Sequence, residues 1–215
     1  PQSVKTLARA VALCAPGDVL SVVPGATPYF EALEFGPRGG LPGRPIVVEG
    51  NGAVLSGLLP IAPEQWQDRG DGLWFFPTTF RHGSLVPFLV LPDGTRIPAA
   101  AKAAAIAPGQ AFWDAQGILY RSDAGRRPGD LGLRGTLRAA GVALAGTCHL
   151  TVRNLTCEYF ANDGFNVHGS CQGLFFENIV ARHNGDDGFS VHEDVGVTVH
   201  AGWFHDNTYG IQDVN

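Results

Sequence analysis

The sequence has few charged residues and almost no lysine. Only 16% of its 215 residues are charged, and the two lysines are Lys5 and Lys102. Its net charge of −5 and its 15 basic residues argue against a nucleic-acid partner, because such a partner requires a clustered basic face. No apolar run reaches the roughly 18 residues that a membrane-spanning helix needs, so we expect no membrane span.

Methionine is absent and the chain begins at Pro1, which we interpret as a processed or excised piece that could have lost an export signal. The four cysteines are too few for a disulfide scaffold in a chain of this length, so buried thiols are expected. Cys148 and Cys171 lie one position out of register with the repeat described below. A disulfide between adjacent coils therefore stays open, and it would indicate export.

Glycine and proline are abundant, with 29 and 15 residues, and 45% of the chain is hydrophobic. This composition indicates many turns and short strands around a sizeable core rather than long helices. We therefore expect an all-β protein, with one large domain or two small ones.

The strongest pattern is an internal repeat of 24 residues. Asn-Asp-Gly-Phe-Asn-Val-His at 162–168 returns as Asp-Asp-Gly-Phe-Ser-Val-His at 186–192, and a third copy aligns at 197–199 and 209–211. The surrounding positions recur at the same offset: Leu150, Val152, Asn154 and Leu155 match Leu174, Phe176, Asn178 and Ile179. Coils of 22 to 24 residues that contain short strands predict a parallel β-helix, whose coils must stack to bury their apolar faces.

The remaining segments suggest three regions. Residues 1–58 are expected to hold a capping helix that begins at Ser3, followed by the first coil, with a corner at 50–52 between two strands. Residues 59–141 lack the repeat and predict a β-rich insertion. Residues 142–215 predict β-helix coils that are truncated at the C-terminus, because no capping segment follows the third copy.

Alternation along the repeated strand predicts a polar outer face. If Phe165 and Val167 point into the core, Asn166 and His168 point outward, and Ser190 and His192 lie above them. We expect an imidazole ladder of His168 and His192. A carboxylate ladder of Asp163 and Asp187 is expected beside it, joined by Asn162 and Asp186, with Glu193 and Asp194 at its rim.

A purely structural interpretation competes with this site. An Asp-Gly step can be a turn device, and that explanation fits Asp163 as well as a functional one does. The adjacent pair Asp186 and Asp187 favours function, because two carboxylates side by side repel each other unless a cation or a shared proton relieves them. Asn154 and Asn178 are interpreted as a structural ladder.

Three chemistries fit these residue types. A Ca²⁺ site would use Asp163, Asp186 and Asp187 to neutralise a sugar carboxylate, and a base would come from His168, His192, His183 or Arg182. A glycoside hydrolase would use carboxylates as acid and base. A transition-metal site on His168 and His192 would lack a third histidine, since Val214 falls at the next rung.

In these coils the sequence resembles the right-handed parallel β-helix superfamily of pectate-lyase-like proteins. The resemblance covers residues 142–215, and residues 1–57 more loosely through Pro16-Gly17-Asp18 and Ile-Val-Val-Glu-Gly-Asn-Gly at 46–52. It implies a carbohydrate-active protein that works outside the cytoplasm on an acidic polysaccharide.

Finer similarities point to several enzyme families within that superfamily. Asn-Asp-Gly-Phe at 162–165 with Asp186-Asp187 is similar to the aspartate motifs of polygalacturonases, whose Gly-His-Gly is replaced here by Tyr-Gly-Ile at 209–211. Residues 187–193 resemble the Tyr-Gly-Phe-Asp-Pro-His-Glu signature of mannuronan C5-epimerases, with His192 at the catalytic histidine. The repeated Asp-Gly-Phe, preceded by a second Asp at 186–189, is also similar to Ca²⁺-dependent pectate lyases, with Ser190 where a further Asp is expected.

The leading hypothesis is an exported lyase or C5-epimerase acting on a uronate polysaccharide. Its predicted catalytic residues are Asp187, Asp186, His192, His168 and Glu193. Its predicted substrate-binding residues are Asp163, Asn166 and Arg182. Asp163, Asp186 and Asp187 are also the predicted Ca²⁺ ligands. The alternatives are a polygalacturonase-like hydrolase using Asp186, Asp187 and Glu193, and a non-catalytic surface or carbohydrate-binding module. The oligomeric state is not predicted.

Overall fold

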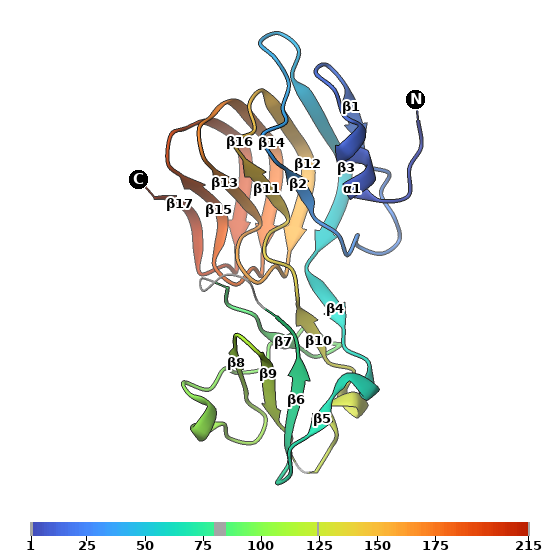
Figure 1. Cartoon of the computed structure of the whole chain (residues 1–215), viewed down its shortest axis with the longest axis vertical. Helices are drawn as coiled ribbons and strands as arrows, with labels where there is room; N and C mark the ends of the chain where they lie inside the picture. Colours follow the sequence, from blue (N-terminus) through green and yellow to red (C-terminus); the bar gives the residue numbers. More distant parts are fainter. Residues whose placement is uncertain (1, 80–84, 124, 215) are drawn as a thin grey trace. The chain divides into compact units, whose positions relative to one another are not determined.

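The computed structural model describes residues 2–79, 85–123 and 125–214, drawn in Figure 1. The chain divides into two compact units, one made of residues 1–57 with 138–215 and the other of residues 58–137. The segment that lacks the repeat, 59–141, overlaps the second unit over residues 59–137.

The first unit is a parallel β-solenoid with two five-stranded sheets, which confirms the predicted all-β, parallel β-helix fold (Figure 1). One sheet contains, in spatial order, β1 (Val19–Ser21), β3 (Ile46–Ser56), β12 (Leu150–Glu158), β14 (Cys171–Arg182) and β16 (Val195–His205). The other contains β2 (Leu33–Phe35), β11 (Val142–Ala145), β13 (Phe165–His168), β15 (Asp187–His192) and β17 (Tyr209–Val214). Each coil runs through one sheet and then through the other, so each repeat adds one strand to each sheet.

The register of the parallel strands follows the sequence repeat. Phe165 pairs with Phe189 in β13 and β15, while Asp187 pairs with Tyr209 in the next rung. In the other sheet Val152 pairs with Phe176, and Phe176 pairs with Val199. The third copy, at 197–199 and 209–211, is therefore confirmed as a coil.

Aromatic side chains from successive coils fill the interior between the two sheets. Phe165, Phe176 and Phe189 are fully buried. The Phe165 and Phe189 ring centroids are 5.9 Å apart in a stacked pair, and Phe176 meets Phe189 edge to face at 4.8 Å. This packing gives the repeated Gly-Phe step a core role, as the alternation predicts.

Asparagines in the left-handed region bend the long strands of the first sheet. Asn154 and Asn178 have φ angles of 55° and 49°, and the Asn178 side-chain amide donates to Asn154 Oδ1 at 2.8 Å. The predicted structural ladder is thus present. Asn51 has a φ angle of 52° inside β3, so the two strands predicted on either side of 50–52 form one continuous strand that bends. Pairing with β12 continues on both sides of the bend.

The glycine of the repeated Asp-Gly-Phe is required by close packing. A Cβ on Gly164 would lie 2.6 Å from Ala181 Cβ and 2.9 Å from the carbonyl oxygen of Gly188. A Cβ on Gly188 would lie 2.6 Å from the carbonyl oxygen of Gly210 in the following coil. Neither glycine has a positive φ, so it is the narrow corner that excludes a side chain.

A short helix, α1 (Leu7–Leu13), packs Leu7 and Val11 into the solenoid core. Its N-cap is Thr6, whose hydroxyl accepts a hydrogen bond from the Arg9 backbone amide at 3.2 Å. The prediction that Ser3 begins the helix was wrong, because Thr6 satisfies the same capping rule nearer to the first buried residue. Among the described residues, no helix combines the length and apolarity of a membrane span.

The four cysteines are free thiols. The Cys148 thiol lies 3.8 Å from the carbonyl oxygen of Ser170, and the Cys171 thiol lies 3.0 Å from that of His168. The disulfide between Cys148 and Cys171 that the sequence left open is not formed. Buried thiols, the default expectation, describe Cys157 and Cys171, whereas Cys14 and Cys148 are partly exposed.

The described strands of the second unit form two small antiparallel sheets. One contains β4 (Leu58–Pro60), β10 (Arg134–Thr136) and β7 (Leu89–Val90); the other contains β5 (Gln67–Asp68), β6 (Leu73–Pro77), β9 (Gly117–Arg121) and β8 (Ala111–Asp114). The described residues of this unit also form the 3₁₀ turns η1 (Pro63–Gln65), η2 (Ala103–Ala105) and η3 (Pro128–Leu131). Its separate core includes Trp66 and Tyr120, whose rings are 6.3 Å apart.

Candidate functional site

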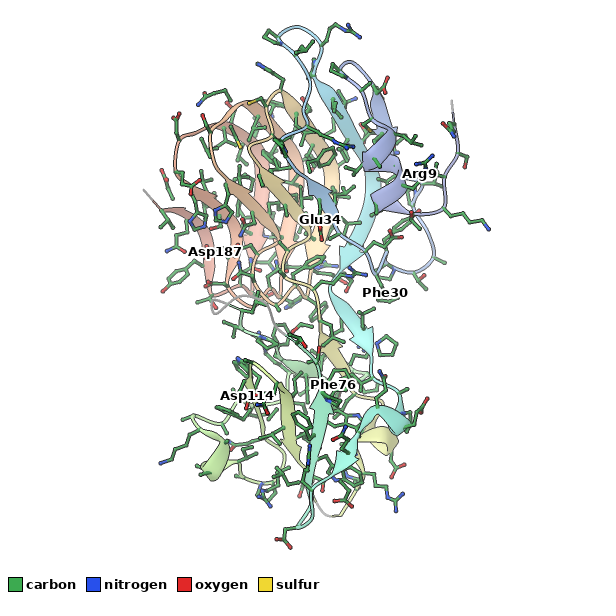
Figure 2. The ribbon with its side chains drawn as sticks, viewed as in Figure 1. Arg9, Phe30, Glu34, Phe76, Asp114 and Asp187 are labelled. Atoms are coloured by element: carbon green, nitrogen blue, oxygen red, sulfur yellow. The ribbon has the colours of Figure 1, made fainter. Side chains whose placement is uncertain are left out.

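The polar residues of the repeat gather where the chain leaves the first sheet and enters the second. Asp163 precedes β13, and Asp187 opens β15 one rung along, as Figure 2 shows for Asp187. Both aspartates are buried, with exposed fractions of 1% and 2%. Because the strands are in register, the same turn in consecutive coils stacks the two carboxylates.

Both carboxylate oxygens of Asp163 accept hydrogen bonds. Its Oδ1 accepts a hydrogen bond from the Asp187 backbone amide at 3.0 Å, and its Oδ2 accepts bonds from the side-chain amides of Asn162, at 2.7 Å, and of Asn166. Burial raises the pKa of Asp163 to about 7, and the charges of Asp187 and Asp186 add to that rise. The hydrogen bonds from Asp187 and Asn166 oppose it.

Asp163, Asp186 and Asp187 form a compact carboxylate cluster. Each offers one carboxylate oxygen, and these atoms all lie within 4.8 Å of one another. Burial raises the pKa of Asp187, and the charge of Asp186 raises it further. Three carboxylates this close are stabilised by a shared proton or by a cation, so the cluster could hold a metal ion.

Two residues that the sequence analysis did not assign to the site, Ser190 and Gln212, contact Asp187. With its amide oriented so that the nitrogen faces the carboxylate, Gln212 donates to Asp187 Oδ2 at 2.8 Å. The Ser190 hydroxyl is a hydrogen-bond partner of the same carboxylate and lowers the pKa of Asp187. Gln212 lies in β17 and pairs with Ser190 of β15. Extending the repeat by one more coil is the sequence signal that could have placed it near Asp187.

His168 and His192 form the predicted imidazole ladder. Their rings are stacked, with centroids 4.2 Å apart and planes at 7°. Partial burial and the neighbouring His192 lower the pKa of His168, while the carboxylate of Glu193 raises it. At neutral pH this favours the uncharged imidazole, which can accept a proton.

Ser190 joins the two ladders. Its hydroxyl oxygen lies 2.8 Å from His192 Nε2, and it also contacts the Asp187 carboxylate. Ser190 is 1% exposed, and its rung neighbour Asn166 is 9% exposed. The alternation of inward and outward positions holds, yet these two outward residues are covered rather than open to solvent.

The other predicted residues occupy separate positions. Arg182 forms an ion pair with Glu158 at 2.7 Å on the first sheet, so its guanidinium is already matched by a carboxylate. His183 stacks on Tyr159 at 5.0 Å, and its Nδ1 lies 3.9 Å from Asp206 Oδ2. Neither side chain has a described contact with the carboxylate cluster.

Glu193 and Asp194 follow β15 directly. Glu193 has a φ angle of 69° at the corner, and its charge acts on His168. Asp194 Oδ2 accepts a bond from the Ser170 hydroxyl at 3.3 Å. Val214 pairs with His192, as the repeat predicts, so no histidine continues the ladder in the following rung.

An asparagine pair supports the turn that carries the cluster. Asn207 Oδ1 accepts hydrogen bonds from the Asn184 backbone amide at 3.0 Å and from its side-chain amide at 2.9 Å. Asn184 Oδ1 in turn accepts from the Phe160 backbone amide at 3.0 Å. Asn184 is fully buried, and these bonds fix the loop that presents Asp186 and Asp187. The sequence analysis missed this pair.

Comparison with known proteins identifies a shared fold. No protein-family description matches the sequence, and no curated protein matches it. A solved structure described as "The complex structure of XylC with xylose" superimposes with a TM-score of 0.59 at 12% identity. The match covers 95% of this chain and 56% of that chain, so this chain spans just over half the length of its structural neighbour. At this identity the likeness establishes the β-helix fold alone.

Proposed function

We propose that this protein is a carbohydrate-active enzyme that abstracts the C5 proton of a uronate unit in an acidic polysaccharide. The observation that carries the proposal is the placement of a three-carboxylate cluster beside a stacked histidine pair, with Ser190 between them. The products would be those of β-elimination or C5 epimerisation. We propose, on the same observations, that the protein belongs to the pectate-lyase-like superfamily.

The carboxylates would serve substrate binding through a cation. Asp163, Asp186 and Asp187 would otherwise repel a uronate, because both partners are anionic. A divalent cation such as Ca²⁺ prefers carboxylate oxygens, and when bound it would neutralise the sugar carboxylate and acidify the adjacent C5–H. Asp186 and Asp187 are the first choices as ligands, since Asp163 already accepts three hydrogen bonds.

The histidine pair would supply the base. His192 would take the C5 proton, while the stacked His168 would hold the ring and exclude water from one of its faces. In elimination, the electron pair of the C5–H bond forms the C4–C5 double bond as the C4–oxygen bond breaks, and the departing oxygen takes a proton from water. In epimerisation, a proton returns to C5 from the opposite face. Glu193 would adjust the charge state of His168.

A glycoside hydrolase is the second candidate, and the raised pKa of Asp163 and Asp187 favours it. A buried carboxyl group with a pKa of about 7, as at Asp163, can donate a proton near neutrality. Asp186, Asp187 and Glu193 would then serve as acid and base. Inversion or retention would follow from the separation of the two catalytic carboxylates.

The structural neighbour lends support to carbohydrate binding in general. XylC was solved in complex with xylose, and the structural match to it covers 95% of this chain. We propose that the protein works outside the cytoplasm, in the extracellular space or the periplasm, where such polymers are found. Arg182 and Asn166 would contribute to substrate binding only if their internal partners were exchanged for sugar groups.

The deciding experiment offers uronate polymers, such as polygalacturonate and polymannuronate, to the purified chain with added Ca²⁺. A lyase product absorbs in the ultraviolet because of its unsaturated uronate, an epimerase product incorporates solvent deuterium at C5, and a hydrolase product shows only new reducing ends. Asp187→Asn should abolish the lyase or epimerase signal, whereas Glu177→Gln, on the first sheet, should leave it unchanged. Full activity of the Asp187 variant on every polymer would overturn the assignment.

A further inference from the structure

Asp186 differs from the other two carboxylates of the cluster in how it is held. Asp163 and Asp187 each accept hydrogen bonds from side-chain amides on their carboxylate oxygens. Among the described residues, none donates a hydrogen bond to the carboxylate of Asp186, which is partly buried. The position of this carboxylate in the cluster therefore depends on how firmly the backbone of Asp186 is fixed.

The backbone around Asp186 is held from the coil on either side. Its amide donates to the carbonyl oxygen of Asn162 in the preceding coil at 2.9 Å. In the following coil, the Thr208 amide donates to the Asp186 carbonyl oxygen at 2.8 Å, and the Tyr209 amide donates to the same oxygen at 3.3 Å. The Thr208 hydroxyl donates to the carbonyl oxygen of Gly185 at 2.9 Å. Thr208 thus contacts this corner twice, once through its main chain and once through its side chain.

The following coil has a shorter corner, which brings Thr208 against Asp186. Between the last paired position of the first sheet and the first paired position of the second, the coil of Asp187 has the four residues 183–186, and the following coil has the three residues 206–208. The two earlier coils have corners of equal length, since their strands pair at an offset of 24 on both sides of the corner. Because the shorter corner takes a more direct path, two successive amides converge on one carbonyl oxygen of the coil before it.

We infer that Thr208 is a positioning residue that holds Asp186 in the carboxylate cluster. Its side-chain bond to Gly185 fixes the peptide unit before Asp186, and its main-chain bond fixes the peptide unit after it. With both peptide units fixed, the Asp186 carboxylate can move only through rotation of its own side chain. The inference rests on the proposed function for its chemical meaning, in which Asp186 is a cation ligand.

Thr208→Val tests the inference, because valine has the shape of threonine and no hydroxyl group to donate. Thr208 is exposed, so the change leaves the core intact, and thermal unfolding checks that the variant is folded. We expect the dissociation constant for Ca²⁺, measured by calorimetric titration with calcium chloride, to rise by about two- to tenfold, the effect of losing one hydrogen bond. Thr208→Ser keeps the hydroxyl group and should restore wild-type affinity. The matched control, Thr198→Val, changes an exposed threonine in β16 of the same coil and should bind Ca²⁺ as the wild type does.

Amide hydrogen exchange follows the corner without any cation or substrate. Measured residue by residue with a chelator present, the amides of Gly185, Asp186 and Asp187 should exchange about two- to tenfold faster in Thr208→Val than in the wild type, because the corner opens more often once the hydroxyl bond is lost. Thr208→Ser and Thr198→Val should keep the wild-type exchange rates.

Unchanged Ca²⁺ affinity in a folded Thr208→Val protein would overturn the inference, and so would a weakened affinity that Thr208→Ser fails to restore. Failure of the proposed function has a different signature, which is a wild-type protein that binds no Ca²⁺ or forms no product from any polymer. If the wild type binds no Ca²⁺, the exchange rates decide the positioning role. Faster exchange at the corner in Thr208→Val then supports that role, and unchanged exchange overturns it.

Discussion

The coil that contains Asp163 and the coil that contains Asp187 have the same backbone and different chemistry. Phe165 and Phe189 pair in register, and both aspartates are buried at the same corner. Asp163, however, accepts three hydrogen bonds from amides, whereas Asp187 accepts one from the Gln212 amide and otherwise meets another carboxylate and a hydroxyl group.

Two substitutions between the coils account for the difference. Asp186 stands where the earlier coil has Asn162, and Ser190 stands where it has Asn166. In the earlier coil both asparagine amides satisfy Asp163. In the later coil these two neighbours become an anion and a hydroxyl group, and this is the coil to which we assign the proposed cation and proton chemistry. The aspartate of the earlier coil thus has a structural role, because it accepts a hydrogen bond from the backbone amide of Asp187.

The largest expected effect is a loss of activity when Asp187, the aspartate of the later coil, is replaced. Asp187→Asn should reduce turnover of the uronate substrate by about 10²- to 10⁴-fold, because a carboxylate at the reacting centre is lost. Initial rates of product formation, with thermal unfolding as a test of folding, would measure this. If Asp187→Asn cost no more activity than Glu177→Gln, the division of roles between the two coils would be wrong.

The pH dependence of stability should single out Asp163. Burial raises its pKa from the ordinary 3.8 to about 7. The folded protein therefore keeps a proton that the unfolded chain loses, so this group makes folding less favourable as the pH rises from about 4 to 7. The change is at most about 1.4 kcal/mol per pH unit.

Asp163→Asn should remove that slope from the free energy of unfolding, measured by denaturant titration at several pH values with a chelator present. Loss of the bonds at Oδ2 should lower stability at acidic pH as well, by about 1–3 kcal/mol. The control, Glu177→Gln, should keep the wild-type slope. An unchanged slope in the Asp163 variant would mean that its carboxyl group ionises with an ordinary pKa.

The corner glycines test whether the two coils are equivalent as scaffold. Gly164→Ala and Gly188→Ala should each lower the free energy of unfolding by about 1–3 kcal/mol, because the new methyl group would overlap the next coil. Gly36→Ala is the matched control, since its Cβ would meet no atom within 4 Å. Equal stability of all three variants would contradict the packing explanation.

The smallest expected effect concerns the bend in the first sheet. Asn178→Ala should cost about 1 kcal/mol, since alanine is strained at a φ angle of 49° and loses the bond to Asn154. Asn178→Gly relieves the backbone strain and isolates the contribution of the hydrogen bond. Both variants should keep wild-type turnover. A clear loss of activity would mean that the asparagine ladder takes part in function, a role that we assign only to the corner containing Asp187.

Sequence reasoning was most reliable where the repeat supplied the spacing. It predicted the stacking of His168 on His192 and the proximity of Asp163, Asp186 and Asp187. It was wrong where a local rule had several equivalent solutions, as with Ser3 and Thr6 as the helix cap. It also split β3 at Asn51, because a bend inside a strand and a turn between two strands use the same residue types.

The sequence by itself determined the coil, its register and the faces of its strands, because a period of 24 residues leaves one way to stack identical apolar faces. Only the tertiary structure decided which polar groups pair. Gln212 reaches Asp187 from the following coil, and Asn207 of that same following coil accepts from Asn184. Such contacts depend on side-chain direction and burial, so only the folded structure distinguishes the three amide partners of Asp163 from the partners of Asp187.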